Sequence, residues 1–111
     1  MTVNDYLRKT RKLIPGFGHQ EVRPCIYCND GFSVSVQASQ FAYCDPRVDD
    51  ADFYSSVELG YPSEPIPELL EYRDGDEPDV NNVFGYVPVQ KVDELLACHG
   101  GIKEVQDGNQ A

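Results

Sequence analysis

Two cysteines separated by two residues, Cys25 and Cys28, have the spacing with which a tight turn presents two thiolates to one zinc ion. Cys44 and either Cys98 or His99 would have to complete the tetrahedral set. A zinc ribbon normally offers a second close pair, whereas Cys44 and Cys98 are isolated in the sequence. We therefore expect no metal and no other cofactor, with zinc as the alternative, and we expect the cysteines to be small buried thiols.

The sequence carries no pattern typical of a catalytic site. The two histidines, His19 and His99, are not spaced to pair with a serine or a cysteine, so nucleophilic catalysis is not indicated. His99 falls at the end of a predicted helix, where it is expected to act as a cap. The acidic segment 74–79 lacks the ligand spacing of an EF-hand, and no glycine-rich phosphate loop follows a strand. We expect a protein that is not an enzyme.

Acidic residues are concentrated in one part of the chain. The 111 residues carry a formal net charge of −10, and residues 45–79 contain twelve acidic side chains but only two basic ones. Carboxylates along a strand and its loops can occupy sites that normally hold phosphates, which would make this protein a DNA mimic for a basic partner. The alternative is a solvated surface with no other role. The candidate partner-binding residues are Asp49, Asp50, Asp52, Glu58, Asp74, Asp76, Glu77 and Asp79.

A second candidate site consists of polar residues around one predicted strand. Ser33, Ser35 and Gln37 share one face of that strand, and Tyr43 and Arg47 follow nearby in the sequence. Together these residues could bind a small phosphorylated ligand, such as a signalling nucleotide. The same polar face could equally well point into water.

The segment 25–47 gives the strongest structural signal. Apolar and polar residues alternate strictly from Phe32 to Ala38, which predicts a strand with one buried face. Asn29-Asp30-Gly31 tolerates positive φ and predicts a hairpin turn that pairs residues 24–28 with 32–38. A third strand is predicted over 54–60, antiparallel to the second. A fourth is predicted over 83–87, with Phe84 and Tyr86 on the face opposite Val83 and Val87.

Helical periodicity appears at both ends of the chain. An apolar stripe predicts a basic-faced helix from Val3 to Leu13, capped by Thr2 or Asn4 and ended by Pro15-Gly16. A second helix is predicted to follow Pro88, which suits a first helical turn, and to end at His99-Gly100-Gly101. Between the third and fourth strands we expect a short helical turn over 68–72 and an exposed acidic loop over 73–82.

These elements predict one α+β domain. Its antiparallel sheet of three or four strands should be packed by the C-terminal helix and by the N-terminal one. Within residues 1–111 we expect a basic helix and connector over 1–20, the α+β core over 21–102 and a frayed tail over 103–111. No apolar run reaches the roughly 20 residues that cross a bilayer, and the N-terminus is charged where a signal peptide would be apolar. We expect a cytoplasmic protein that does not contact a membrane.

The strings DGFSVSVQAS, YCDPR, YSSVELGYPSEP and VFGYVPVQKVDELLACHGGI resemble a family of small uncharacterised accessory proteins of bacteriophages and prophages. The resemblance covers residues 28–102. It implies a protein that binds and disables a host component, of which anti-CRISPR proteins are the best-known class.

The resemblance leads us to expect a partner in the cytoplasm of the host cell. That partner would be a host protein or nucleoprotein complex with a basic surface, and this chain would make no direct contact with nucleic acid. The alternatives are a sponge that sequesters a defence signalling nucleotide, and a structural or regulatory phage protein. Whether the chain forms a homodimer is left open.

Overall fold

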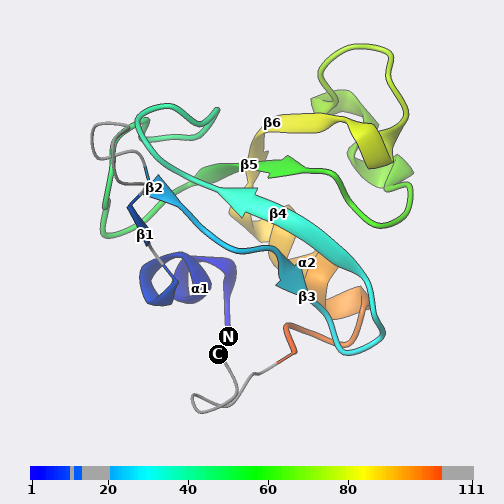
Figure 1. Cartoon of the computed structure of the whole chain (residues 1–111), viewed down its shortest axis with the longest axis horizontal. Helices are drawn as coiled ribbons and strands as arrows, with labels where there is room; N and C mark the ends of the chain where they lie inside the picture. The colour runs from blue at the N-terminus through cyan, green and yellow to red at the C-terminus, as the bar shows by residue number, and fades with distance from the viewer. Residues whose placement is uncertain (11, 14–20, 104–111) are drawn as a thin grey trace.

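The computed structural model describes residues 1–10, 12–13 and 21–103. Strands β3 to β6 form an antiparallel four-stranded sheet in the order β3-β4-β5-β6, and β1 and β2 form a separate antiparallel pair (Figure 1). This confirms the predicted α+β fold. In chain order, the elements are α1 (Val3–Lys9), β1 (Lys12–Leu13), β2 (Glu21–Val22), β3 (Ile26–Tyr27), β4 (Ser33–Gln37), β5 (Ser56–Gly60), the 3-10 helices η1 (Pro67–Tyr72) and η2 (Asp79–Asn81), β6 (Val83–Pro88) and α2 (Val89–Cys98).

The predicted hairpin joins β3 and β4. Ile26 lies opposite Val34 in the register of the two strands. The turn closes with two backbone hydrogen bonds: the Cys28 N–H donates to the Phe32 carbonyl at 2.8 Å, and the Gly31 N–H donates to the Cys28 carbonyl at 3.0 Å. Gly31 has a φ of 98°, which a residue without Cβ adopts at little cost. The turn chemistry predicted from the sequence is therefore the one that forms.

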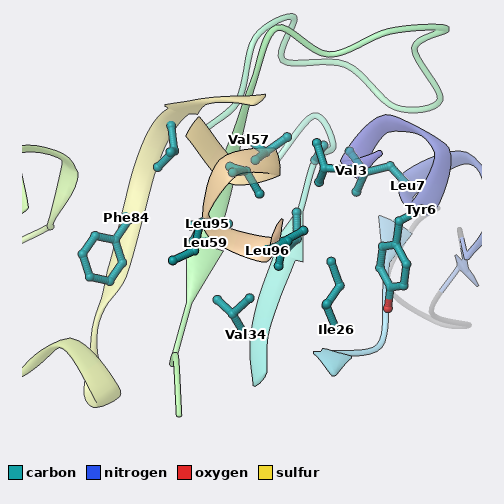
Figure 2. Close-up of a cluster of buried hydrophobic side chains, with 14 of the residues drawn as sticks. Val3, Tyr6, Leu7, Ile26, Val34, Val57, Leu59, Phe84, Leu95 and Leu96 are labelled. Atoms are coloured by element: carbon teal, nitrogen blue, oxygen red, sulfur yellow. The ribbon is translucent and has the colours of Figure 1, made fainter. Parts of the chain in front are cut away.

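The core lies between one face of the sheet and the two helices. Val34 and Val36 of β4 are fully buried while Ser33, Ser35 and Gln37 are partly exposed, as the alternation predicts. Figure 2 shows Leu95 and Leu96 of α2 beside the apolar side chains of β4, β5 and β6, with residues of α1 extending the same cluster. Helix α1 is thus docked onto the domain, as expected for a helix too short to be stable alone.

A Schellman motif ends α2. The Gly101 N–H donates to the Leu96 carbonyl at 2.8 Å, and the Gly100 N–H donates to the Ala97 carbonyl at 3.1 Å. Gly100 has a φ of 86°, and His99 is the C-cap. The predicted end of this helix is confirmed, and His99 occupies the C-cap position.

Helix α1 is shorter than predicted. Thr2 caps it through a capping box with Asp5, but it ends at Lys9 with Thr10 as the C-cap, so Leu13 and the Pro15-Gly16 pair do not define its end. Lys12 and Leu13 instead pair with Glu21 and Val22 as strands β1 and β2. Strand pairing replaces the last helical turn, and periodicity alone could not reveal that partner. The predicted connector over 17–20 and the tail beyond residue 103 lie outside the described residues.

A β-bulge in β6 overturns the predicted faces of that strand. Leu59 of β5 lies opposite Phe84, but Val57 lies opposite Val87, so β6 has one extra residue between the two pairs. Phe84 and Val87 are consequently both buried, whereas Tyr86 is exposed and has a φ of 55°. The prediction that Phe84 and Tyr86 share a face is wrong, because the extra residue resets the alternation.

The sheet face opposite α2, which we call the open face, carries Tyr27, Ser33, Ser35, Gln37 and Glu58. Segments of the chain cover both edges of this sheet. The Lys103 N–H donates to the Tyr27 carbonyl of β3 at 2.7 Å, and the Asp74 N–H donates to the Val83 carbonyl of β6 at 2.9 Å. A partner therefore meets side chains rather than an unpaired strand at these positions.

No helix in the described ranges is long and apolar enough to cross a membrane.

The burial pattern of β4 gives a direct test of the fold. Val36→Asp should lower the free energy of unfolding by several kcal/mol, because it places an unpaired carboxylate in the apolar core. Ser35→Asp, one residue away on the open face, should change it by only about 1 kcal/mol or less. Urea unfolding of both variants measures the difference, and equal destabilisation would show that the faces of β4 are assigned wrongly.

Candidate functional site

The candidate acidic residues do not form one continuous band. Asp49, Asp50 and Asp52 belong to the segment 45–52, the first acidic loop, which precedes β5. Asp74, Asp76 and Glu77 belong to the segment 74–77, the second acidic loop, which lies between η1 and η2. The connections that carry the two loops lie at opposite ends of the sheet (Figure 1). A partner would thus meet two separate acidic patches.

Internal hydrogen bonds fix the first acidic loop. The Tyr54 hydroxyl donates to the Val48 carbonyl at 2.7 Å and accepts from the Ala51 N–H at 3.2 Å, so a buried ring spans the loop. The Asp49 carboxylate accepts from the backbone N–H and the side-chain amide of Gln40, at 3.0 and 2.8 Å. Asp49 therefore shapes the loop, while Asp50 and Asp52 are the candidate residues of this loop that are exposed.

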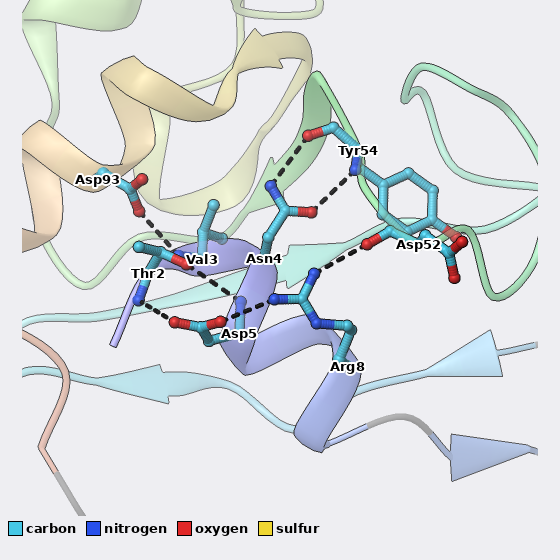
Figure 3. A network of polar contacts seen from close by, with 8 residues as sticks. All are labelled: Thr2, Val3, Asn4, Asp5, Arg8, Asp52, Tyr54 and Asp93. Carbon is cyan, nitrogen blue, oxygen red and sulfur yellow. Dashed lines mark hydrogen bonds and ion pairs between the residues drawn. The ribbon is translucent and has the colours of Figure 1, made fainter.

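Helix α1 holds the far end of the same loop (Figure 3). The buried Asn4 amide donates to the Tyr54 carbonyl at 3.0 Å and accepts from the Tyr54 N–H at 2.8 Å. The backbone N–H and carbonyl of Tyr54 therefore both have hydrogen-bond partners, as they would beside a neighbouring strand. Arg8 donates to the Asp52 carbonyl at 2.8 Å and also pairs with Asp5 at 2.7 Å. The loop is therefore attached to a docked helix.

Asp79 has a structural role instead of the expected surface role. It is only 8% exposed, and its carboxylate accepts from the Ile66 N–H at 2.8 Å and from Arg73 at 3.2 Å. The prediction that the whole segment 73–82 is exposed is wrong at this residue, because the carboxylate satisfies a buried N–H of the preceding connection. It is also wrong at Asn82, which is buried and donates to the Glu77 carbonyl at 2.8 Å. Asp74, Asp76 and Glu77 are exposed, as predicted.

Glu58 lies on the open face, away from the tip of either acidic loop. It stands opposite Gln37 in the register of β4 and β5 and is partly exposed. Its carboxylate accepts from the Tyr43 N–H at 3.0 Å, which draws the connection between β4 and β5 over the sheet. This carboxylate therefore both positions Tyr43 and adds negative charge to the open face.

The residues of the nucleotide-pocket alternative are only partly brought together. The guanidinium carbon of Arg47 lies 5.4 Å from the centre of the Tyr43 ring, a cation-π contact. Ser33 and Gln37 lie at opposite ends of β4, about 13 Å apart along an extended strand. The Gln37 amide is already bonded to the backbone of Arg23, at 2.9 and 2.8 Å.

An exposed tyrosine pair was missed by the sequence analysis. The rings of Tyr43 and Tyr86 have their centres 6.0 Å apart with an interplanar angle of 31°, and the two residues are 43% and 50% exposed. Gly85 allows this approach, since a Cβ there would lie 3.2 Å from the Tyr43 Cβ. The one signal in the sequence was a glycine inside a predicted strand, which often marks a bulge.

Arg23, one of the nine basic residues of the chain, is buried. It is 4% exposed, and its guanidinium donates to the Leu7 carbonyl at 3.0 Å and to the Ala38 carbonyl at 2.6 Å. It thereby joins the end of α1 to the end of β4. Its guanidinium is therefore used within the fold, as the carboxylate of Asp79 is.

The cysteines divide into two buried and two exposed thiols. Burial raises the pKa of the Cys28 and Cys44 thiols, which keeps them protonated and poorly suited as metal ligands. Cys25 and Cys98 are exposed, so the expectation that all four are buried is wrong for these two. Among the described residues, no group of three or more histidine, cysteine or acidic side chains could hold a metal ion.

His99 is engaged in packing and in an ion pair with the hairpin turn. Its ring stacks on Phe32 with centres 4.0 Å apart, and its Nδ1 lies 2.7 Å from the Asp30 carboxylate. The Phe32 N–H, which donates to this carboxylate, and then His99 lower the pKa of Asp30. These contacts tie α2 to the hairpin turn.

A groove of about 550 Å³ lies between α1, α2 and the side chain of Phe53. It is lined by Asn4, Arg8, Phe53, Val89, Asp93 and Ala97, and none of the predicted site residues reaches it. The Asp93 carboxylate already accepts from the Val3 N–H at 2.8 Å, and this hydrogen bond links α2 to the start of α1 (Figure 3).

Comparison of the chain with protein-family models, with curated proteins and with solved structures finds no match.

Substituting the buried Asp79 and an exposed acidic residue tests which carboxylates stabilise the fold. Asp79→Ala should lower the free energy of unfolding by roughly 2–4 kcal/mol, because it leaves the Ile66 N–H and Arg73 without their acceptor. Asp76→Ala removes the same charge from an exposed position and should change it by less than about 0.5 kcal/mol. Thermal unfolding of the two variants provides the comparison, and equal melting temperatures would contradict the role given to Asp79.

Proposed function

We propose that this protein acts by binding and not by catalysis, and that its acidic loops occupy the basic surface of a nucleic-acid-handling partner. The first acidic loop is the observation that carries this proposal. Its backbone is fixed by Tyr54, Asn4 and Arg8, while Asp50 and Asp52 remain exposed. A loop that is already ordered loses little conformational entropy on binding, so its carboxylates can act as a preformed substitute for phosphates.

The distribution of charge supports the same conclusion. The chain carries a net charge of −10, to which the exposed residues of both acidic loops contribute. A field of this sign attracts a basic surface and speeds its association with the protein, while it repels nucleic acid. Direct binding of DNA or RNA is therefore no part of the proposal.

The resemblance to small phage proteins favours one form of this function. In that form the partner is a nucleoprotein complex of a host defence system, and the protein blocks its nucleic-acid-binding surface in the cytoplasm of the host cell. The acidic loops support the basic character of the partner, and the resemblance alone suggests its biological setting.

The geometry favours this proposal over a nucleotide sponge. Arg47, the one cation among the five pocket candidates, donates through Nε to the Ala42 carbonyl at 3.0 Å and lies against Tyr43. The polar groups of Gln37 bond to Arg23 and Ser35. Because these side chains already form hydrogen bonds within the protein, they have fewer donors left for a phosphate.

Neutralising each acidic patch tests the proposal. The double variant Asp50→Asn/Asp52→Asn should slow association with a partner captured from bacterial lysate about tenfold at low salt, with little change in dissociation. Asparagine keeps the shape of these side chains and tolerates the positive φ of Asp50. Surface plasmon resonance at about 0.1 M and 1 M salt measures the rates, and the effect should shrink as the Debye length falls.

Two variants with the same change in net charge serve as controls. Asp74→Asn/Asp76→Asn tests the second acidic loop, and Glu68→Gln/Glu71→Gln tests exposed carboxylates of η1. The first acidic loop should have the largest effect. Equal rates for all three variants would mean that the acidic residues form only a solvated surface, and a nucleotide that co-purifies with the protein would replace this proposal by the sponge.

A further inference from the structure

The exposed pair Tyr43 and Tyr86 lies at the rim of the open face, next to the connection that carries the first acidic loop. We infer that this tyrosine pair is an arginine-binding site that anchors the basic partner. The inference rests on the proposed function, because it names the side chain through which a basic protein would be held. Tyrosine and arginine are also the residue types that most often dominate protein interfaces.

The β-bulge in β6 creates the pair. The extra residue turns the Tyr86 N–H out of the β5 ladder, and this N–H donates to the Tyr43 carbonyl at 3.0 Å. Tyr43 can then lie against the backbone of Gly85, where an added Cβ would be a tight 3.2 Å from the Tyr43 Cβ. Both rings are thus positioned by backbone contacts and remain about half exposed.

Tyr86 carries a large ring on a backbone conformation that favours glycine. A bulky residue rarely adopts a φ of 55°, because its Cβ crowds the following carbonyl in the left-handed region. The ring is half exposed, and within the domain it contacts the ring of Tyr43. The bulge therefore presents two neighbouring aromatic rings to a partner.

Charge identifies arginine as the side chain that fits. Glu58 lies on β5 opposite the bulge, since its neighbours Val57 and Leu59 pair with Val87 and Phe84. A cation at the pair would therefore meet both the negative faces of the rings and a nearby carboxylate. A planar guanidinium stacks on aromatic rings better than an ammonium does, which favours arginine over lysine.

The protein itself shows that one ring of the pair, that of Tyr43, accepts a guanidinium. Arg47 lies over Tyr43, held there by its hydrogen bonds to the Phe41 and Ala42 carbonyls. Within the described residues, no cationic side chain lies over the ring of Tyr86. The partner's arginine would extend this stack onto Tyr86.

Two labelled peptides of equal charge, nona-arginine and nona-lysine, test the inference by fluorescence anisotropy with the full chain at about 0.1 M salt. The wild-type protein should bind the arginine peptide more tightly, by a factor on the order of five. Tyr86→Gly should reduce this ratio to about one and leave the affinity for the lysine peptide unchanged within about twofold. Thermal unfolding should show that the variant is as stable as the wild type, and Tyr86→Asn serves as a second variant if it is not.

Tyr61→Gly is the matched control. Tyr61 is also an exposed tyrosine with positive φ, at 60% exposure and 51°, but it has no contact with the pair. The arginine site would be overturned if Tyr86→Gly left the ratio of the two peptide affinities unchanged, or if Tyr61→Gly lowered that ratio equally. Either result would leave the proposed binding of a basic partner by the acidic loops unaffected. Failure of the wild-type protein to bind either peptide would overturn the proposed function as well.

Discussion

The hydrogen bond from the Tyr86 N–H to the Tyr43 carbonyl, 3.0 Å long, joins the sheet to the connection that carries the first acidic loop. It exists because β6 has one extra residue, which frees that N–H from the ladder with β5. The other end of the same connection is held by Asn4 of α1 through the backbone of Tyr54. With both ends attached, the first acidic loop and the tyrosine pair occupy fixed places relative to the core.

Several charged side chains form hydrogen bonds within the fold and therefore add little charge to the surface. Arg23 joins α1 to β4, Asp79 satisfies the Ile66 N–H, and Asp49 shapes the first acidic loop. What remains exposed is predominantly acidic, in two patches at opposite ends of the sheet, with Glu58 on the open face. Sorting the charges in this way explains why a count along the sequence suggests one acidic band, whereas the structure has two separate acidic patches.

Features that depend on neighbouring residues could be predicted from the sequence. The alternation in β4, the turn at Gly31 and the glycine end of α2 are all set by local chemistry, and the structure has them. The faces of β6, the end of α1 and the burial of Asp79 depend on partners far away in the chain. No local sequence pattern predicts such partners. The tyrosine pair, formed by residues 43 positions apart in the chain, is a further example.

The central claim is that a basic partner binds across the first acidic loop and the tyrosine pair. Nuclear magnetic resonance of the labelled protein, titrated with an arginine-rich peptide, tests it most directly because each backbone amide reports separately. The largest shifts are expected at Tyr43, Glu58 and Tyr86 and at residues 50–52. Shifts centred instead on the groove lined by Arg8, Phe53 and Ala97, with the tyrosine pair unchanged, would contradict this account.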